Sequence, residues 1–241
     1  MKTVLVTGAT RGLGLAIVRR LSALPYKVIG TGRKETNEVQ ELGEANPNFY
    51  FVPVDLSESE KIPGFVKAVT AEHGHLFGLV NNAGIGHDGI LPTIHEKHIQ
   101  ALLDVNLLAP IVLAKYASRS MLRVPNGGGR IINISSVVSL TGYKGLSVYA
   151  ATKAGLIGFS KSLARELGNQ RITVNAIAPG FMESDMTAGL TSSKLESIKR
   201  RCALPELAQP DDVASGVEFL LSDGAANITG TTLVVDAGSS A

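Results

Sequence analysis

The chain has 241 residues, 44% of them hydrophobic, and its 23 basic and 21 acidic residues give a formal net charge of +2. This composition is enough for a sizeable core rather than a disordered chain, and the balanced charge offers no strong electrostatic case for nucleic acid or membrane binding. The single cysteine, Cys202, excludes an intrachain disulfide or a cysteine-cluster metal site, which fits a reducing compartment.

The first apolar run of the sequence starts at Lys2, so we predict no signal or transit peptide ahead of the fold and a cytoplasmic location. The longest apolar segment is interrupted by Asp104, Asn106 and Lys115. We therefore predict no membrane span.

Short apolar runs alternate along the chain with longer segments of helical periodicity. The predicted strands are Val4–Val6, Val28–Ile29, Tyr50–Val52, Leu76–Val80, Arg130–Ile134, Ile172–Ile177 and Thr232–Val235, and the clearest predicted helices are Leu13–Leu24, Ile99–Met121, Tyr149–Leu167 and Asp211–Leu221. This alternation predicts an α/β fold of the Rossmann type: one doubly wound parallel sheet of about seven strands with helices on both faces, in a single domain over residues 1–241. Residues 181–204 are the least patterned and are predicted to form a substrate lid.

The first predicted strand turns into a helix through Gly8, Gly12 and Gly14, within the sequence VLVTGATRGLGLAIVRRL. Glycines allow a pyrophosphate to approach the backbone closely, and the N-terminus of the following helix attracts its charge. The spacing differs from G-x-G-x-x-G, so a tight turn with no ligand stays open as an alternative.

The second predicted strand ends in Gly32 and Arg33, where an NAD-preferring site usually places an acid. Arg33, with Arg11 of the glycine loop as a second cation, would suit the 2′-phosphate of NADPH. We therefore favour NADPH over NADH; the alternative is a pair of solvated surface arginines.

Tyr149 and Lys153 lie four residues apart at the start of the apolar segment VYAATKAGLIGFSKSLAREL. On a helix they would point to one spot, where an ammonium would lower the pKa of the phenol from about 10 and favour proton exchange. The alternative is a tyrosine that anchors the helix and a lysine that reaches solvent.

Four motifs together resemble the short-chain dehydrogenase/reductase family from end to end: TGATRGLG at 7–14, NNAG at 81–84, YAATK at 149–153 and APG at 178–180. Residues 130–167 and 172–187 most resemble the 3-oxoacyl-acyl-carrier-protein reductases of fatty-acid synthesis. Two features depart from the family pattern: Ser184 replaces a frequent threonine, and the RVPNGGG segment before the fifth strand alters the surface.

The resemblance implies a role for each matching residue. Tyr149 would be the general acid, Lys153 would lower its pKa and hold the nicotinamide ribose, Ser136 would bind the substrate carbonyl, and Asn106 would support a water chain to Lys153. Choosing Ser136 over Ser135 rests on family spacing, and a surface amide is the alternative for Asn106. The implied cofactor contacts are Gly8, Arg11, Gly12, Leu13, Gly14, Arg33, Asp55, Leu56, Asn82, Ala83, Gly84, Tyr149, Lys153, Pro179, Gly180, Met182 and Ser184, with Asp55 at the adenine and Met182 at the nicotinamide carboxamide.

The function implied is NADPH-dependent reduction of a 3-oxoacyl-acyl-carrier-protein to its 3-hydroxyacyl form, with a possible acyl carrier protein as partner. The alternatives are an NADP(H)-dependent oxidoreductase of another small alcohol or ketone, and a dinucleotide-binding sensor without turnover. No metal is predicted, because His87, Asp88, His95 and His98 are interpreted as loop polarity. The apolar helices at 102–121 and 149–167 predict a homotetramer, as the family does.

Overall fold

The computed structural model describes residues 1–124, 127–182 and 192–241. Its sheet has the strand order β3-β2-β1-β4-β5-β6-β7, and every neighbouring pair is parallel. The strands are β1 (Lys2–Thr7), β2 (Tyr26–Gly32), β3 (Phe49–Pro53), β4 (Leu76–Asn81), β5 (Gly129–Ile134), β6 (Ile172–Pro179) and β7 (Thr232–Val235). The predicted doubly wound parallel sheet of about seven strands is confirmed.

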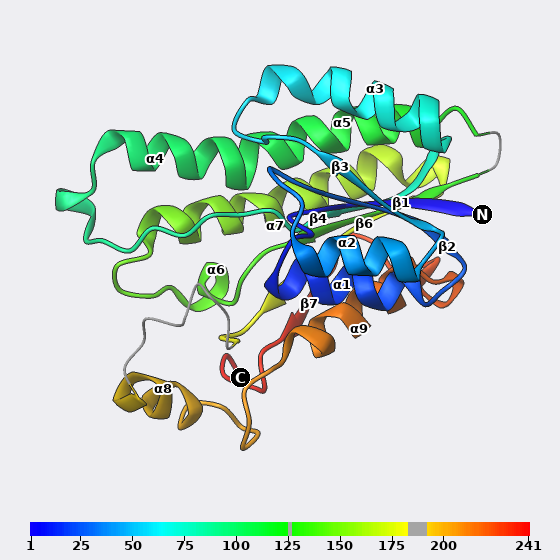
Figure 1. Ribbon diagram of the computed structural model, residues 1–241. Helices are drawn as coiled ribbons and strands as arrows, with labels where there is room; N and C mark the ends of the chain where they lie inside the picture. The colour runs from blue at the N-terminus through cyan, green and yellow to red at the C-terminus, as the bar shows by residue number, and fades with distance from the viewer. Residues whose placement is uncertain (125–126, 183–191) are drawn as a thin grey trace.

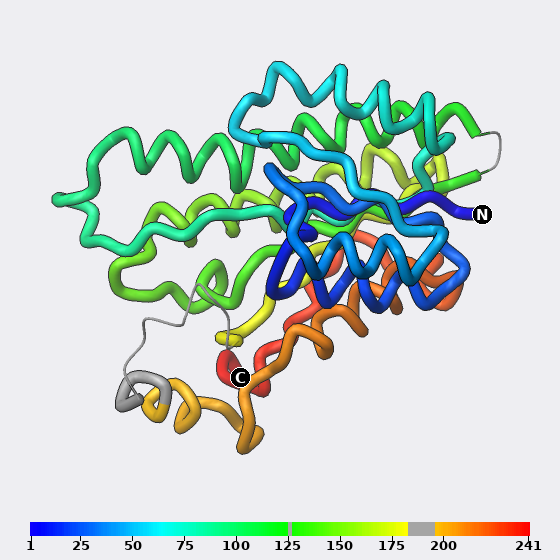
Figure 2. Tube along the Cα trace, viewed as in Figure 1, coloured from blue at the N-terminus to red at the C-terminus, as the bar shows by residue number. Residues whose placement is uncertain are grey.

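Two layers of helices cover the sheet (Figure 1). One layer contains α1 (Gly12–Ser22), α2 (Asn37–Ala45) and α9 (Pro210–Leu221), and the other contains α3 (Ile62–His73), α5 (Ala109–Met121) and α7 (Ser147–Leu167). The short helix α6 (Val138–Thr141) follows β5, and α8 (Ser192–Lys199) lies outside both layers (Figure 2). The sequence had indicated these strands and the main helices but placed several of their ends one to three residues away.

Side chains alternate between the two faces of the sheet along each strand, which explains why helices cover both faces. Val4 and Val6 of β1 pack into the core cluster beneath α1 and α9, whereas Leu5 between them packs into the cluster beneath α3 and α5. Side chains of a strand alternate between faces, so a strand buried on both faces reads as a continuous apolar run. This is the pattern from which the parallel sheet was predicted.

One long helix runs from Glu96 to Met121, through α4 (Glu96–Leu103), a π-helical turn at Asp104–Leu108, and α5. Within the described residues it is the one helix long and apolar enough to cross a membrane, with a mean hydropathy of 1.4 in its best window. The helix is the segment that Asp104, Asn106 and Lys115 were expected to interrupt, and its length and composition alone do not make it a membrane span, because helices of soluble proteins pass the same test. The helix packs against α3, α7 and the sheet, and 33% of its apolar window is buried within the chain.

The strand order reverses at β1, which lies between β2 and β4. In open α/β sheets, ligands bind outside the carboxyl ends of the strands at such a switch point. The loops that follow β1, β4, β5 and β6 therefore define where a site is expected.

Candidate active site

Tyr149 and Ser136 meet beyond the carboxyl end of β5. Tyr149 lies in the first turn of α7, and Ser136 lies between β5 and α6. Their side chains are hydrogen-bonded, which lowers the pKa of Tyr149, but burial of the phenol has the larger effect and raises that pKa above its ordinary value of 10.0. The sequence predicted a lowered pKa for Tyr149, and this is wrong for the structure, where burial of the phenol dominates and the net shift is upward.

The two serines after β5 have different environments. The buried Ser135 hydroxyl donates to the carbonyl oxygen of Lys153 at 2.8 Å and so fastens α7 to the strand. The Ser136 hydroxyl instead faces Tyr149 and accepts a weak bond from the Val138 amide at 3.4 Å. The geometry therefore favours Ser136, not Ser135, as the partner of Tyr149.

Lys153 is buried, with 4% of its surface exposed, and its ammonium points back toward the sheet. Its Nζ donates to the carbonyl oxygen of Ile134 at 2.9 Å and lies 5.7 Å from the centre of the Tyr149 ring. Burial lowers the pKa of Lys153 to about 8. The alternative of a lysine that reaches solvent is wrong, and the Ile134 carbonyl is a contact that no sequence motif could indicate.

Asn106 lies in the π-helical turn and is fully buried, so the surface-amide alternative is wrong. Its Oδ1 accepts from the Ile85 amide at 2.8 Å and its Nδ2 donates to the Ile85 carbonyl at 2.9 Å. The Nδ2 also lies 3.4 Å from the Thr152 hydroxyl, which donates to the Tyr149 carbonyl at 2.7 Å. A π-turn frequently marks a functional position, and here it turns an amide toward α7.

Gly84 lies where these segments converge. A Cβ placed on Gly84 would lie 3.3 Å from Asn106 Oδ1 and 3.4 Å from Lys153 Nζ. The NNAG loop, the π-turn and α7 thus come together within contact distance. Four residues separated in the sequence by up to 47 positions, Asn106, Ser136, Tyr149 and Lys153, form one cluster.

The glycine loop is shaped by contacts with the NNAG segment. Gly8 has a φ of +67°, and a Cβ there would lie 2.8 Å from the Cα of Ala83. A Cβ on Gly14 would lie 1.9 Å from the carbonyl oxygen of Gly8, whereas Gly12, at a φ of +51°, has open space around the same position. A side chain is therefore sterically excluded at Gly8 and Gly14, and Gly12 faces outward.

Asn82 and Ala83 hold this loop from the side of β4. The Asn82 Nδ2 donates to the carbonyl oxygens of Thr7 at 2.8 Å and Gly8 at 3.1 Å. The amides of Asn82 and Ala83 both donate to the Thr7 hydroxyl, at 3.0 and 2.9 Å. The structure thus gives Asn82 a role in shaping the loop, and Thr7 a role that the sequence reading did not assign despite its place beside Gly8.

The first turn of α1 is suited to an anion. It contains no acidic residue, and its N-cap residue Arg11 makes no side-chain capping bond. Free amides at a helix start, combined with the positive end of the helix dipole, bind phosphate groups. The open space at Gly12 gives such a group access, so the residues present fit a dinucleotide pyrophosphate. Leu13, predicted as a contact, directs its side chain into the core cluster under α1.

The ends of β2 and β3 lie beside this helix start. A Cβ on Gly32 would lie 2.7 Å from the Thr10 methyl group, so no carboxylate side chain can occupy that position without displacing Thr10. The exposed Arg33 interacts electrostatically with Asp55, whose pKa is lowered chiefly by hydrogen bonds from the Ser57 amide and hydroxyl. Leu56, also predicted as a contact, is buried in the core, so only its backbone is available to a ligand.

The segment at the end of β6 is hydrogen-bonded to the segments that follow β5 and to β7. The Pro179 carbonyl accepts from the Val137 amide at 2.9 Å, and the Gly180 amide donates to the Val235 carbonyl at 2.8 Å. A Cβ on Gly180 would lie 2.7 Å from the Cα of Asp236. Met182 packs against the core, whereas Ser184 and the rest of residues 183–191 of the predicted lid lie outside the described residues.

The histidines considered for a metal lie between β4 and α4 and in the first turn of α4. The rings of His87 and His98 stack at 4.0 Å between centres, and His95 meets His98 edge-on at 6.4 Å. Among the described residues, no group of three or more His, Cys, Asp or Glu side chains has an arrangement that could hold a metal ion.

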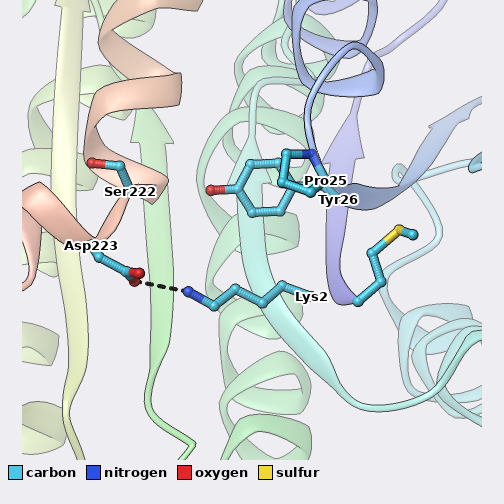
Figure 3. Close-up of a pocket in the computed structure, with 6 residues that line it drawn as sticks. Lys2, Pro25, Tyr26, Ser222 and Asp223 are labelled. Carbon is cyan, nitrogen blue, oxygen red and sulfur yellow. Dashed lines mark hydrogen bonds and ion pairs between the residues drawn. The ribbon is translucent and has the colours of Figure 1, made fainter.

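A separate depression lies at the amino ends of the strands, lined by Met1, Lys2, Pro25, Tyr26, Ser222 and Asp223 (Figure 3). Its exposed Lys2 and Asp223 form an ion pair at 2.8 Å. It contains none of the predicted site residues and lies at the edge of the sheet opposite to them.

Comparison with known proteins gives consistent matches. A family described as short chain dehydrogenase matches residues 2–195. The 3-oxoacyl-[acyl-carrier-protein] reductases FabG of Vibrio cholerae serotype O1 and Escherichia coli K12 are 40% and 41% identical to this chain, and each alignment covers 98% of this chain and 96% of the relative. A short-chain type dehydrogenase/reductase from Mycobacterium ulcerans superimposes with a TM-score of 0.93 at 30% identity, over 99% of this chain and 89% of that one.

Proposed function

Because this chain belongs to the short-chain dehydrogenase family and is thus an oxidoreductase that uses a nicotinamide dinucleotide, we propose that it is a reductase whose cofactor is NADPH. Its substrate is 3-oxoacyl-acyl-carrier-protein, which it reduces to 3-hydroxyacyl-acyl-carrier-protein in the cytoplasm, as a step of fatty-acid synthesis. The observation that carries the proposal is the convergence of Asn106, Ser136, Tyr149 and Lys153 in a chain about 40% identical to reductases of that name. Acyl carrier protein is then the partner that presents the substrate.

Tyr149 acts as the general acid. Its raised pKa keeps the phenol protonated at neutral pH, which is the form able to give a proton to a carbonyl oxygen under reduction. Ser136, hydrogen-bonded to Tyr149, binds the same oxygen, so two donors meet the charge as it develops on that atom. When bound, NADPH supplies the hydride that reduces the carbonyl carbon.

Lys153 and Asn106 support this proton transfer. At pH 7 the Lys153 ammonium is charged, because its pKa of about 8 lies above that pH, and it favours the phenolate left when Tyr149 has given up its proton. Lys153 also binds the nicotinamide ribose. Asn106, whose Oδ1 and Nδ2 are held by Ile85, keeps the NNAG loop against this lysine.

The cofactor is held along the carboxyl edge of the sheet. The glycine loop and the start of α1 bind the pyrophosphate, as the fit of Gly8, Gly12 and Gly14 supports. Arg33 and Arg11 bind the 2′-phosphate, which is why NADPH is preferred to NADH. Asp55 and the backbone of Leu56, Asn82 and Ala83 would hold the adenosine, and Pro179, Gly180 and Met182 would hold the nicotinamide.

We also infer a homotetramer in which the Glu96–Met121 helix and α7 pack against copies of themselves. Only 33% of the apolar 18-residue window in the Glu96–Met121 helix is buried within the chain. Within this helix, Leu103 and Leu108 are 37% and 41% exposed. Surplus apolar surface of this kind is usually buried by another subunit.

The decisive experiment is NADPH oxidation by the purified protein with acetoacetyl-acyl carrier protein, acetoacetyl-coenzyme A and simple ketones. We expect the acyl-carrier substrate to give the highest kcat/KM. Faster reduction of a simple ketone would assign the enzyme to another metabolite. Tight NADPH binding without turnover on any of the three would identify a sensor and overturn the proposal.

A further inference from the structure

Three consecutive residues at the end of β5 hold helix α7. The Asn133 Nδ2 donates to the Ser160 hydroxyl oxygen at 2.8 Å, the Ile134 carbonyl accepts from Lys153 Nζ at 2.9 Å, and the Ser135 hydroxyl donates to the Lys153 carbonyl at 2.8 Å. Asn133, Ser135, Lys153 and Ser160 are all buried. The strand and the helix are thus joined at the level of the reactive lysine and again at Ser160.

The Asn133 amide is itself fixed in orientation. Its Oδ1 accepts from the Asn81 Nδ2 at 2.8 Å, and Asn81 is its register partner in the β4–β5 pair. The Asn81 Nδ2 also lies 3.3 Å from the Pro110 carbonyl, at the start of α5. Since Asn81 directly precedes Asn82, which holds the glycine loop, the polar chain runs from that loop through β4 and β5 to α7.

Lys153 and Ser160 lie seven residues apart, which is two helical turns and roughly 10 Å along one face. Attachment to the sheet at the level of Lys153 alone would allow α7 to rotate or slide about that point. Attachment at two levels on the same face fixes both the rotation and the axial position of the helix. Nothing in the reaction proposed above uses Asn133 or Ser160 directly.

We propose that Asn133 is a positioning residue which, through Ser160, sets the place of α7 on the sheet and thereby the distances of Tyr149 from Ser136 and of Lys153 from the cofactor. This inference rests on the proposed function for the roles of Tyr149 and Lys153. Displacement of a catalytic group by about 1 Å can reduce turnover about a hundredfold, so a remote bond can have a large effect on kcat.

The test compares Asn133→Ala with a matched control, Asn175→Ala. Asn175 is also buried and lies on the adjacent strand β6, where its side chain donates to the Ile228 carbonyl at 2.8 Å and accepts from the Thr231 amide at 3.2 Å, away from α7. Asn133→Ala leaves Ser160 bonded to the Leu156 carbonyl and Asn81 close to the Pro110 carbonyl, so neither donor is stranded.

For Asn133→Ala we expect kcat to fall about tenfold or more with substrate KM nearly unchanged, the pH profile of kcat to shift, and the Kd for NADPH to rise about fivefold. Asn175→Ala should lose similar thermal stability with kcat, pH profile and Kd within about twofold of wild type. Ser160→Ala should reproduce the Asn133→Ala effects, and the double variant should add little to either, because one bond is removed twice.

Wild-type kcat and an unmoved pH profile in Asn133→Ala, or equal losses in Asn175→Ala, would overturn the inference. Additive losses of kcat in the double variant would also overturn the inference, because they would show that the two substitutions remove different interactions. If the wild-type protein reduces none of the three substrates, the proposed function fails. The positioning role is then decided by the Kd for NADPH alone: it stands if Asn133→Ala weakens binding about fivefold and Asn175→Ala does not.

Discussion

Replacement of Lys153 by methionine should change the pH dependence of stability as well as activity. The ammonium is buried and its pKa is lowered from 10.5 to about 8, because burial penalises its charged form. The unfolded chain therefore binds more protons than the folded chain between about pH 8 and pH 10.5, so the free energy of unfolding contributed by this group rises with pH across that window. Below about pH 8 both states are protonated and the dependence disappears.

The size of the effect follows from the shift. Between pH 7 and about pH 9.5, the free energy of unfolding of the wild-type protein should rise by about 2 kcal/mol relative to Lys153→Met, which has no group to titrate there. Urea unfolding of both proteins without cofactor, at the two pH values, measures this difference directly. The difference cancels the titrations that both proteins share, such as that of Tyr149.

A difference between the two proteins that stays constant with pH, or falls as pH rises, would refute the burial of a charged Lys153. The same variant tests the role assigned above: NADPH affinity and turnover should both decrease, because the ribose and the phenol share this side chain. A purely catalytic defect would mean that Lys153 does not bind the ribose.

Three further predictions concern the acid, the cofactor and the assembly. Tyr149→Phe should lower kcat at least about a hundredfold while leaving the NADPH Kd nearly unchanged in fluorescence titrations, because only the transferable proton is lost; near-normal turnover would exclude Tyr149 as the acid. Arg33→Asp should weaken NADPH binding much more than NADH binding, since it places a carboxylate against the 2′-phosphate. Equal losses for both cofactors, or the same result from the exposed Arg119→Asp, would remove Arg33 from phosphate recognition. Light scattering at micromolar concentration should give a tetramer that Leu108→Glu dissociates, and a fully active wild-type monomer would contradict this.

The architecture was accessible from the sequence because it depends on local patterns. Strands such as Leu76–Asn81 are buried on both faces and read as apolar runs, and the helices between them carry a clear periodicity. The glycine loop was likewise recognisable, since Gly8 and Gly14 occupy positions where a Cβ would collide with backbone atoms. Each of these features depends on residues that are close together in the sequence.

The arrangement around Lys153 was not accessible in the same way. Its main partner is the Ile134 carbonyl, a backbone group that every residue carries and no motif marks. The π-turn that aims Asn106 at Ile85 occurs within an ordinary helical pattern, because tertiary contacts, not propensity, stabilise it. Leu13 and Leu56 show a related limit: a motif position can bring the backbone to a ligand while the side chain serves the core.

The pKa values of Tyr149 and Lys153 explain why a buried ammonium is useful at this site. Burial of each group lowers the pKa of Lys153 and raises that of Tyr149, so at neutral pH the free protein holds a charged lysine beside a neutral phenol. In the reaction proposed above, a negative charge appears within the same buried region when Tyr149 transfers its proton. Attraction between opposite charges in a poorly solvated site is far stronger than in water. In that proposed reaction the attraction between Lys153 and Tyr149 grows as the proton leaves, and an interaction that strengthens toward the transition state is the kind that raises kcat.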